Sequence, residues 1–115
     1  MIRAVAIFML CTMSGMNCKM ENARVTSYVP EFGGHNCAEP CHLTAFMEPI
    51  NYGQTLACGP NIPYGTDVYI DGWGWGQCLD RGGAITDSRI DIAMRAEDEG
   101  HFIHGDFQVA WVLDQ

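Results

Sequence analysis

Two aspartates, Asp80 and Asp91, are the residues of this 115-residue chain best suited to acid–base chemistry. Residues 89–94 read Arg-Ile-Asp-Ile-Ala-Met, so apolar and polar side chains alternate around the second of them. In an extended strand Ile90 and Ile92 share one face, and Asp91 lies on the other. If the isoleucines face a core, Asp91 faces a groove or the solvent.

Asp80 directly precedes a turn, Arg-Gly-Gly at residues 81–83, that would bring the two carboxylates near one another. A carboxylate beside another carboxylate, or in apolar surroundings, holds its proton to a higher pH and can serve as a general acid. The structural alternative is that Asp80 caps the turn while Asp91 pairs with Arg81 or Arg89. Residue spacing alone favours this alternative slightly.

Two tryptophans, Trp73 and Trp75, alternate with glycines in the segment Gly-Trp-Gly-Trp-Gly at residues 72–76. They lie two residues apart and share one face if the chain is extended. Flat rings flanked by glycine are suitable platforms for sugar rings, and ordinary core packing is the alternative. The sequence contains no glycine-rich phosphate loop and no spacing typical of a nucleophilic triad.

The first residues have the pattern of a secretory signal. A basic start, Met-Ile-Arg, is followed by an apolar run at residues 4–10 and by small residues near Gly15. The run is too short to anchor the chain across a bilayer. We therefore expect a leader at residues 1–23, a domain at residues 24–115, and a secreted or cell-envelope protein, with a phage origin also open. A buried N-terminal strand is the alternative.

Export would explain the cysteines, because disulfides persist in oxidising compartments. Four cysteines follow the expected leader: Cys37, Cys41, Cys58 and Cys78. They allow three pairings, among which the sequence does not choose. We expect Cys58 to pair with Cys78 or with one of the other two. The alternative is a zinc site at Cys37, Cys41 and either His35 or His42, although the spacing is not that of a zinc knuckle.

The elements that must position these residues are short strands and turns. The expected strands are residues 24–29, 43–46, 54–58, 67–70, 89–94 and 107–113, with turns at 59–66 and 81–84 and a helical turn at 96–100. So many short strands without a long helix indicate an all-β fold, closed into a barrel.

The formal net charge is −8, so phosphate backbones and anionic membrane surfaces are disfavoured as partners. A glycan needs hydrogen bonds and aromatic faces rather than opposite charge, and it remains a suitable partner.

Several segments, in order, resemble the "3D" domain family, which is named for three aspartates. They are Val-Thr-Ser-Tyr at residues 25–28, Leu-Thr-Ala at 43–45, and Ile-Pro-Tyr-Gly-Thr-Asp-Val-Tyr-Ile at 62–70. The sharpest match is Leu-Asp-Arg-Gly-Gly-Ala-Ile at 79–85, followed by Arg-Ile-Asp at 89–91. The resemblance covers nearly all of the expected domain.

The resemblance implies a six-stranded double-psi β-barrel with short helical turns, as in membrane-bound lytic transglycosylase A and expansins. It also implies that Asp91 is the catalytic acid and that Asp80 lines the same groove. Three motif residues are expected to contact substrate together with the two tryptophans: Thr44, Gly82 and Gly83. No cofactor or metal is expected, and the partner of the monomer would be the peptidoglycan glycan strand.

Two positions depart from the family pattern. Cys58 and Gly59 stand where the family carries its first aspartate, and Phe46 and Met47 replace the Ser-Gly that usually follows Thr-Ala.

The resulting hypothesis is a lytic transglycosylase that cleaves the bond between N-acetylmuramic acid and N-acetylglucosamine. A hydrolase using both carboxylates and water is a close variant. A non-catalytic wall-binding module is the alternative that the missing first aspartate favours, whereas retention of Asp80 and Asp91 favours the enzyme. An exported inhibitor or structural protein is a third class, which no motif singles out.

Overall fold

Six β-strands and one short 3-10 helix make up the part of the chain that the computed structural model describes, which is residues 15, 17–30, 41–82, 86–101 and 104–113. The elements are β1 (Cys18–Tyr28), β2 (Thr55–Ala57), β3 (Asp67–Ile70), β4 (Gly74–Asp80), β5 (Arg89–Ala93), η1 (Ala96–His101) and β6 (Gly105–Val112). Within these ranges, the structure contains no helix with the length and apolar character needed to cross a bilayer.

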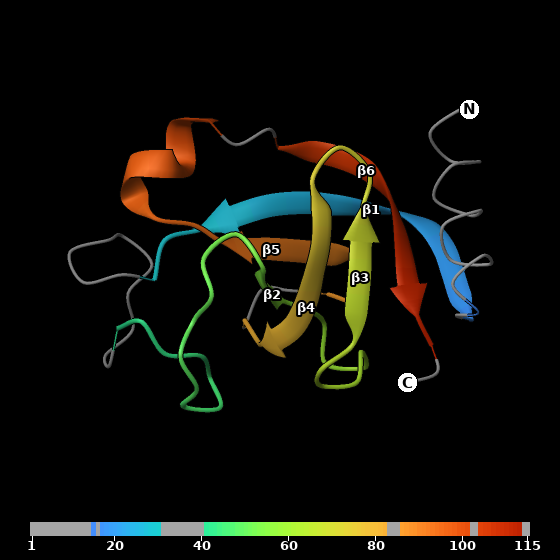
Figure 1. Ribbon diagram of the computed structural model, residues 1–115, viewed down its shortest axis with the longest axis horizontal. Helices are drawn as coiled ribbons and strands as arrows, with labels where there is room; N and C mark the ends of the chain where they lie inside the picture. Colours follow the sequence, from blue (N-terminus) through green and yellow to red (C-terminus); the bar gives the residue numbers. More distant parts are fainter. Residues whose placement is uncertain (1–14, 16, 31–40, 83–85, 102–103, 114–115) are drawn as a thin grey trace.

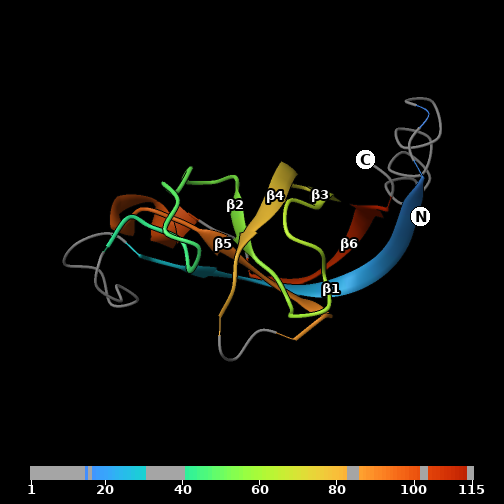
Figure 2. The same cartoon turned by 90° about the horizontal axis from the view of Figure 1, so that it is seen from below.

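The strands close into a barrel in the order β1-β5-β2-β4-β3-β6, which confirms the prediction of a mainly β, closed fold (Figure 1). Neighbours are parallel in the pairs β1–β5 and β2–β4 and antiparallel in the other pairs around the barrel. In Figure 2, β1 curves along one side of the barrel beneath the other strands. Closure supplies each strand with two neighbours and removes exposed sheet edges.

Alternating apolar side chains fill the interior. In β5, Ile90 and Ile92 are fully buried while Asp91 is half-buried, so the predicted alternation is confirmed. Val68 in β3 and Val109 in β6 are likewise fully buried in the same core. Burying an aliphatic side chain of this size stabilises a fold by roughly 1.5–3 kcal/mol.

The first strand is longer than the sequence pattern predicted. β1 begins at Cys18 rather than at residue 24, and its antiparallel ladder with β6 starts at the pair Cys18 and Val112. Polar residues such as Lys19 are therefore part of the barrel, because a full set of backbone partners on β6 outweighs their low strand propensity. Residues 1–14 and 16 lie outside the described part, so removal of a leader stays a prediction.

The strand expected at residues 43–46 is wrong, because this segment is a turn that contributes only a single bridge between Leu43 and Pro49. The Thr44 hydroxyl accepts hydrogen bonds from the backbone N–H groups of Phe46 (3.2 Å) and Glu48 (3.3 Å). Such local bonds compete with a strand ladder.

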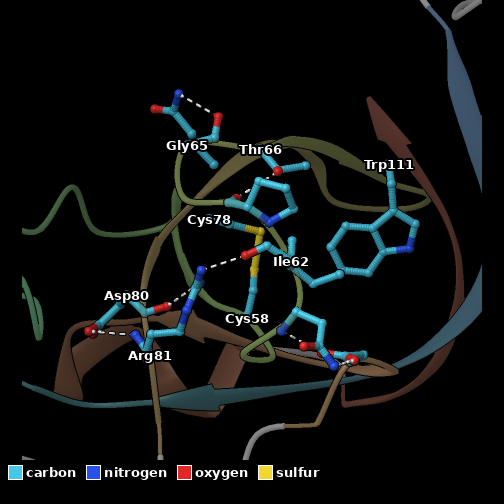
Figure 3. The surroundings of a disulfide bond; sticks show 12 residues. Cys58, Ile62, Gly65, Thr66, Cys78, Asp80, Arg81 and Trp111 are labelled. Atoms are coloured by element: carbon cyan, nitrogen blue, oxygen red, sulfur yellow. Dashed lines mark hydrogen bonds between the residues drawn. A yellow bond between two sulfur atoms is a disulfide. The ribbon is translucent and has the colours of Figure 1, made fainter. Parts of the chain in front are cut away.

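A disulfide joins Cys58, which follows β2, to Cys78 in β4, and both residues are fully buried (Figure 3). This confirms the prediction that Cys58 is part of a disulfide. Its sequence separation of 20 residues corresponds to about 3 kcal/mol in the chain-entropy model. Cys41 is also disulfide-bonded rather than a free thiolate ligand for zinc, and Cys37 and His35 lie outside the described residues.

Candidate functional site

Asp91 lies in the middle of β5, beside Thr26 of β1 in the parallel ladder. The Thr26 hydroxyl donates a hydrogen bond to Oδ1 of Asp91. The same hydroxyl oxygen accepts from Nε and Nη2 of Arg89, each at 3.3 Å. Because a hydroxyl has a single proton, the Arg89 contacts direct that proton toward Asp91. No second hydrogen-bond partner of the Asp91 carboxylate is found among the described residues.

Asp80 is the last residue of β4 and is buried, with 6% of its surface exposed. Its Oδ2 accepts a hydrogen bond from the Tyr28 hydroxyl at 2.6 Å. Its Oδ1 accepts from the backbone N–H groups of Ala45 at 2.6 Å and Arg81 at 2.9 Å. Three donors suit an ionised carboxylate, which only accepts hydrogen bonds. Asp80 therefore links the end of β1 to the 44–48 turn and to the end of β4.

The charges of both Asp80 and Asp91 act on Tyr28. Burial raises its pKa well above the usual range, and its hydrogen bond to Asp80 and the charges of Asp80 and Asp91 raise the pKa further. The phenol therefore stays protonated and remains a hydrogen-bond donor over the ordinary pH range.

Both acids lie beside the same residue of β2. Ala57 is aligned with Asp91 on β5 and with Asp80 on β4. The β2–β4 register shifts between Leu56 and Ala57, and such a bulge re-aims the side chains that follow it. Because β2 lies between β4 and β5, the Cα atoms of Asp80 and Asp91 are separated by two strand-to-strand distances, roughly 10 Å. That the two carboxyl groups share one open groove stays a prediction.

The motif residues expected to contact substrate have different surroundings. Thr44 is buried, and its hydroxyl already holds the turn that follows it, while the next residue, Ala45, contacts Asp80. Gly82 is exposed, two residues after Asp80. Gly83 lies outside the described residues.

The tryptophans lie at the start of β4, at the other end of the strand from Asp80. Trp73 is in the turn before β4, 40% exposed, and its Nε1 donates to the Gly53 carbonyl at 2.9 Å. Trp75 is 39% exposed and packs edge-to-face on the Tyr69 ring, with centroids 5.3 Å apart. The two rings therefore have different partners.

Trp73 lines a hollow of about 400 Å³ together with Tyr52 and Arg95. The Arg95 guanidinium lies 4.3 Å from the centre of the Tyr52 ring.

Neither position at which the resemblance leads one to expect a further aspartate, Cys58 or Gly59, has space for a carboxylate. Cys58 is fully buried in its disulfide. At Gly59, a Cβ atom would lie 2.6 Å from Cα and 2.5 Å from the backbone N of Asp87. That distance is far below van der Waals contact, so any side chain would push the two loops apart.

Two site residues, Thr26 and Tyr28, were not singled out from the sequence, and Arg89, named there as a possible partner of Asp91, donates to the Thr26 hydroxyl instead. The first two belong to the Val-Thr-Ser-Tyr segment and lie on one face of β1, since they are two residues apart. That alternation was visible in the sequence, but their partners Asp91 and Asp80 follow only from the barrel's register.

The Thr26 hydroxyl holds the Asp91 carboxyl group, which can give or take a proton, and the bond between Tyr28 and Asp80 ties the end of β1 to the end of β4. In the described part of the chain, no three His, Cys, Asp or Glu residues are grouped so that they could hold a metal ion. Comparison with protein-family models, with curated proteins and with solved structures gives no match for this chain.

Proposed function

We propose that this chain cleaves the glycan strand of peptidoglycan as a lytic transglycosylase, with Asp91 acting first as acid and then as base. The observation that carries the proposal is the setting of Asp91. It is half-buried and bonded to Thr26 through one oxygen, and the other oxygen has no partner among the described residues. A general acid needs a fixed carboxyl group and access to the oxygen that it protonates.

In the first step, protonated Asp91 gives its proton to the glycosidic oxygen between N-acetylmuramic acid and N-acetylglucosamine. The bond from that oxygen to C1 of the muramyl unit breaks. The muramyl 6-hydroxyl oxygen then bonds to C1, and its proton passes to the Asp91 carboxylate. The product is a 1,6-anhydro ring, the enzyme regains its proton, and no water is consumed.

Asp80 is a positioning residue in this mechanism. All three of its hydrogen bonds come from the protein, and both of its oxygens are occupied. A hydrolase would need a second carboxylate with a free oxygen to activate water or attack the sugar. The bonding of Asp80 therefore favours the transglycosylase over the two-carboxylate hydrolase.

Two structural features support membership in the three-aspartate family and its double-psi barrel. The closed barrel combines two parallel pairs, β1–β5 and β2–β4, with antiparallel neighbours. Met47, which stands where the family has glycine, has a left-handed backbone with φ of 62°. That conformation is accessible to glycine at no steric cost.

An exported location fits this function, because peptidoglycan lies outside the cytoplasmic membrane. The disulfide between Cys58 and Cys78 supports export, since such bonds persist in oxidising compartments.

A non-catalytic wall-binding module is the second candidate. The disulfide and the Asp87 backbone fill the place where the family carries its first aspartate. The site then lacks one of the three family carboxylates, which favours binding without catalysis.

Incubation of the purified protein with peptidoglycan sacculi, followed by mass spectrometry, separates these candidates. The proposal predicts muropeptides that end in 1,6-anhydromuramic acid. Products with a reducing end, one water heavier, would identify a hydrolase. Sedimentation of the protein with intact sacculi, without released products, would identify a binding module.

A further inference from the structure

Three apolar side chains near Asp80 are exposed instead of joining the core. Phe46 is 47% exposed, Met47 62% and Tyr64 44%. Phe46 and Tyr64 come from different turns, yet their rings meet edge-to-face with centroids 4.7 Å apart. An aromatic pair of this kind on the surface is a common feature of binding sites.

The pair is held in place by polar contacts. The Thr44 hydroxyl accepts from the N–H groups of Phe46 and Glu48, and the nearby Glu48 side chain raises the pKa of the Tyr64 hydroxyl. The guanidinium of Arg81 lies over the Phe46 ring, 5.8 Å from its centre. The rings are therefore pre-organised, which lowers the entropy that a ligand must overcome.

The aromatic pair is continuous with the acidic site. Ala45, which immediately precedes Phe46, donates its N–H to Oδ1 of Asp80, and so does the backbone of Arg81. A ligand that rests on the Phe46 ring therefore lies beside the segment that contacts Asp80.

We propose that Phe46 and Tyr64 form a platform for one sugar ring of the glycan strand, next to the linkage that Asp91 cleaves. The proposal rests on the function proposed above. The axial C–H groups of a pyranose pack against aromatic faces, and Arg81 and Glu48 provide polar groups at the rim. Because the chain carries a net charge of −8, we assign the platform to the uncharged N-acetylglucosamine rather than to the muramyl unit with its carboxylate.

Isothermal titration with peptide-free glycan octasaccharides, built of alternating N-acetylglucosamine and N-acetylmuramic acid, tests this platform. All proteins carry Asp91→Asn so that the ligand survives the titration. Phe46→Ala and Tyr64→Ala should each weaken binding about tenfold, the scale of one lost aromatic contact. Phe46→Trp keeps a ring and should retain the affinity. Asp106→Asn, at an exposed carboxylate on β6, is the control and should bind as the parent does.

Thermal unfolding of each variant verifies that it is folded. If the parent binds the octasaccharide and both alanine variants bind equally tightly, the platform is refuted while the proposed function stands. Equal weakening by Asp106→Asn would also refute it. If the parent does not bind and the wild-type protein releases no products from sacculi, both proposals fail.

Discussion

Asp80 and Asp91 lie on either side of Ala57, yet their surroundings differ sharply. Asp80 is buried and accepts three hydrogen bonds from three segments of the chain. Asp91 is half-buried and accepts one, from Thr26. The same side chain is therefore a structural anchor at one position and a candidate acid at the other. Hydrogen bonding, rather than residue type, separates the two roles.

The largest effect should come from removing the anchor. Asp80→Ala leaves the hydroxyl of Tyr28 and the N–H groups of Ala45 and Arg81 without their acceptor. Each buried donor without a partner costs about 1–3 kcal/mol, so we expect the free energy of unfolding to fall by about 3 kcal/mol or more. Urea denaturation measures this change. Asp106→Ala, at an exposed carboxylate, is the control and should stay within about 0.5 kcal/mol. A loss of stability no larger than the control's would show that Asp80 is not an anchor.

Tyr28→Phe removes one donor and should cost about 1.5–3 kcal/mol at neutral pH, the range for a hydrogen bond to a charged group. The pKa of Tyr28 is raised in the folded protein, whereas the unfolded phenol titrates near its ordinary pKa of about 10. The contribution of Tyr28 to the free energy of unfolding should therefore be fully present below about pH 10 and should decline as the pH rises above that value. The variant should decline less steeply. The free energy of unfolding is measured by urea titration at pH 9 and pH 11. An equal fall between these pH values in wild type and variant would show that the pKa of Tyr28 is not raised by folding.

Thr26→Val tests how Asp91 is positioned. The variant keeps the shape of the side chain but loses the donor to Asp91 and the acceptor for Arg89. We expect kcat on glycan to fall about tenfold with KM nearly unchanged, because a misplaced acid slows proton transfer without weakening substrate binding. Thr26→Ser should restore the rate. A change in KM alone would assign Thr26 to binding.

The smallest effect concerns the turn attached to Asp80. Met47→Gly should raise the free energy of unfolding by about 1 kcal/mol, since the left-handed backbone at this position costs about 1–2 kcal/mol for residues other than glycine. Met47→Ala is the matched control, because alanine also has a Cβ atom and so has the same unfavourable left-handed backbone. Equal stability of the two variants, by thermal unfolding, would mean that the backbone strain is relieved in another way.

Much of the barrel could be predicted from local pattern. The alternation around Asp91 and the strand Asp67–Ile70 depend on period-two side chains, and both are observed. The strand expected at residues 43–46 failed because the Thr44 hydroxyl and the Asp80 carboxylate take up backbone N–H groups that a strand would have given to a neighbour.

The candidate site was only half predictable. The sequence pattern identified both aspartates, but their different environments depend on contacts across 52 residues to Tyr28 and 65 residues to Thr26. Likewise, four cysteines allow three pairings by counting alone, and the choice of Cys78 for Cys58 follows from the adjacency of β2 and β4. Long-range register of this kind leaves no local trace in a single sequence.

The most direct measurement is the rate of anhydromuropeptide release by Asp91→Asn, compared with wild type and with the exposed control Asp106→Asn. Asparagine preserves size and can still accept from Thr26, but it carries no transferable proton. We expect Asp91→Asn to lose about 10²-fold or more in rate, the usual scale of general acid catalysis, while stability and sedimentation with sacculi persist. Asp106→Asn should match wild type. Equal rates for wild type and Asp91→Asn would contradict the assignment of Asp91 as the acid.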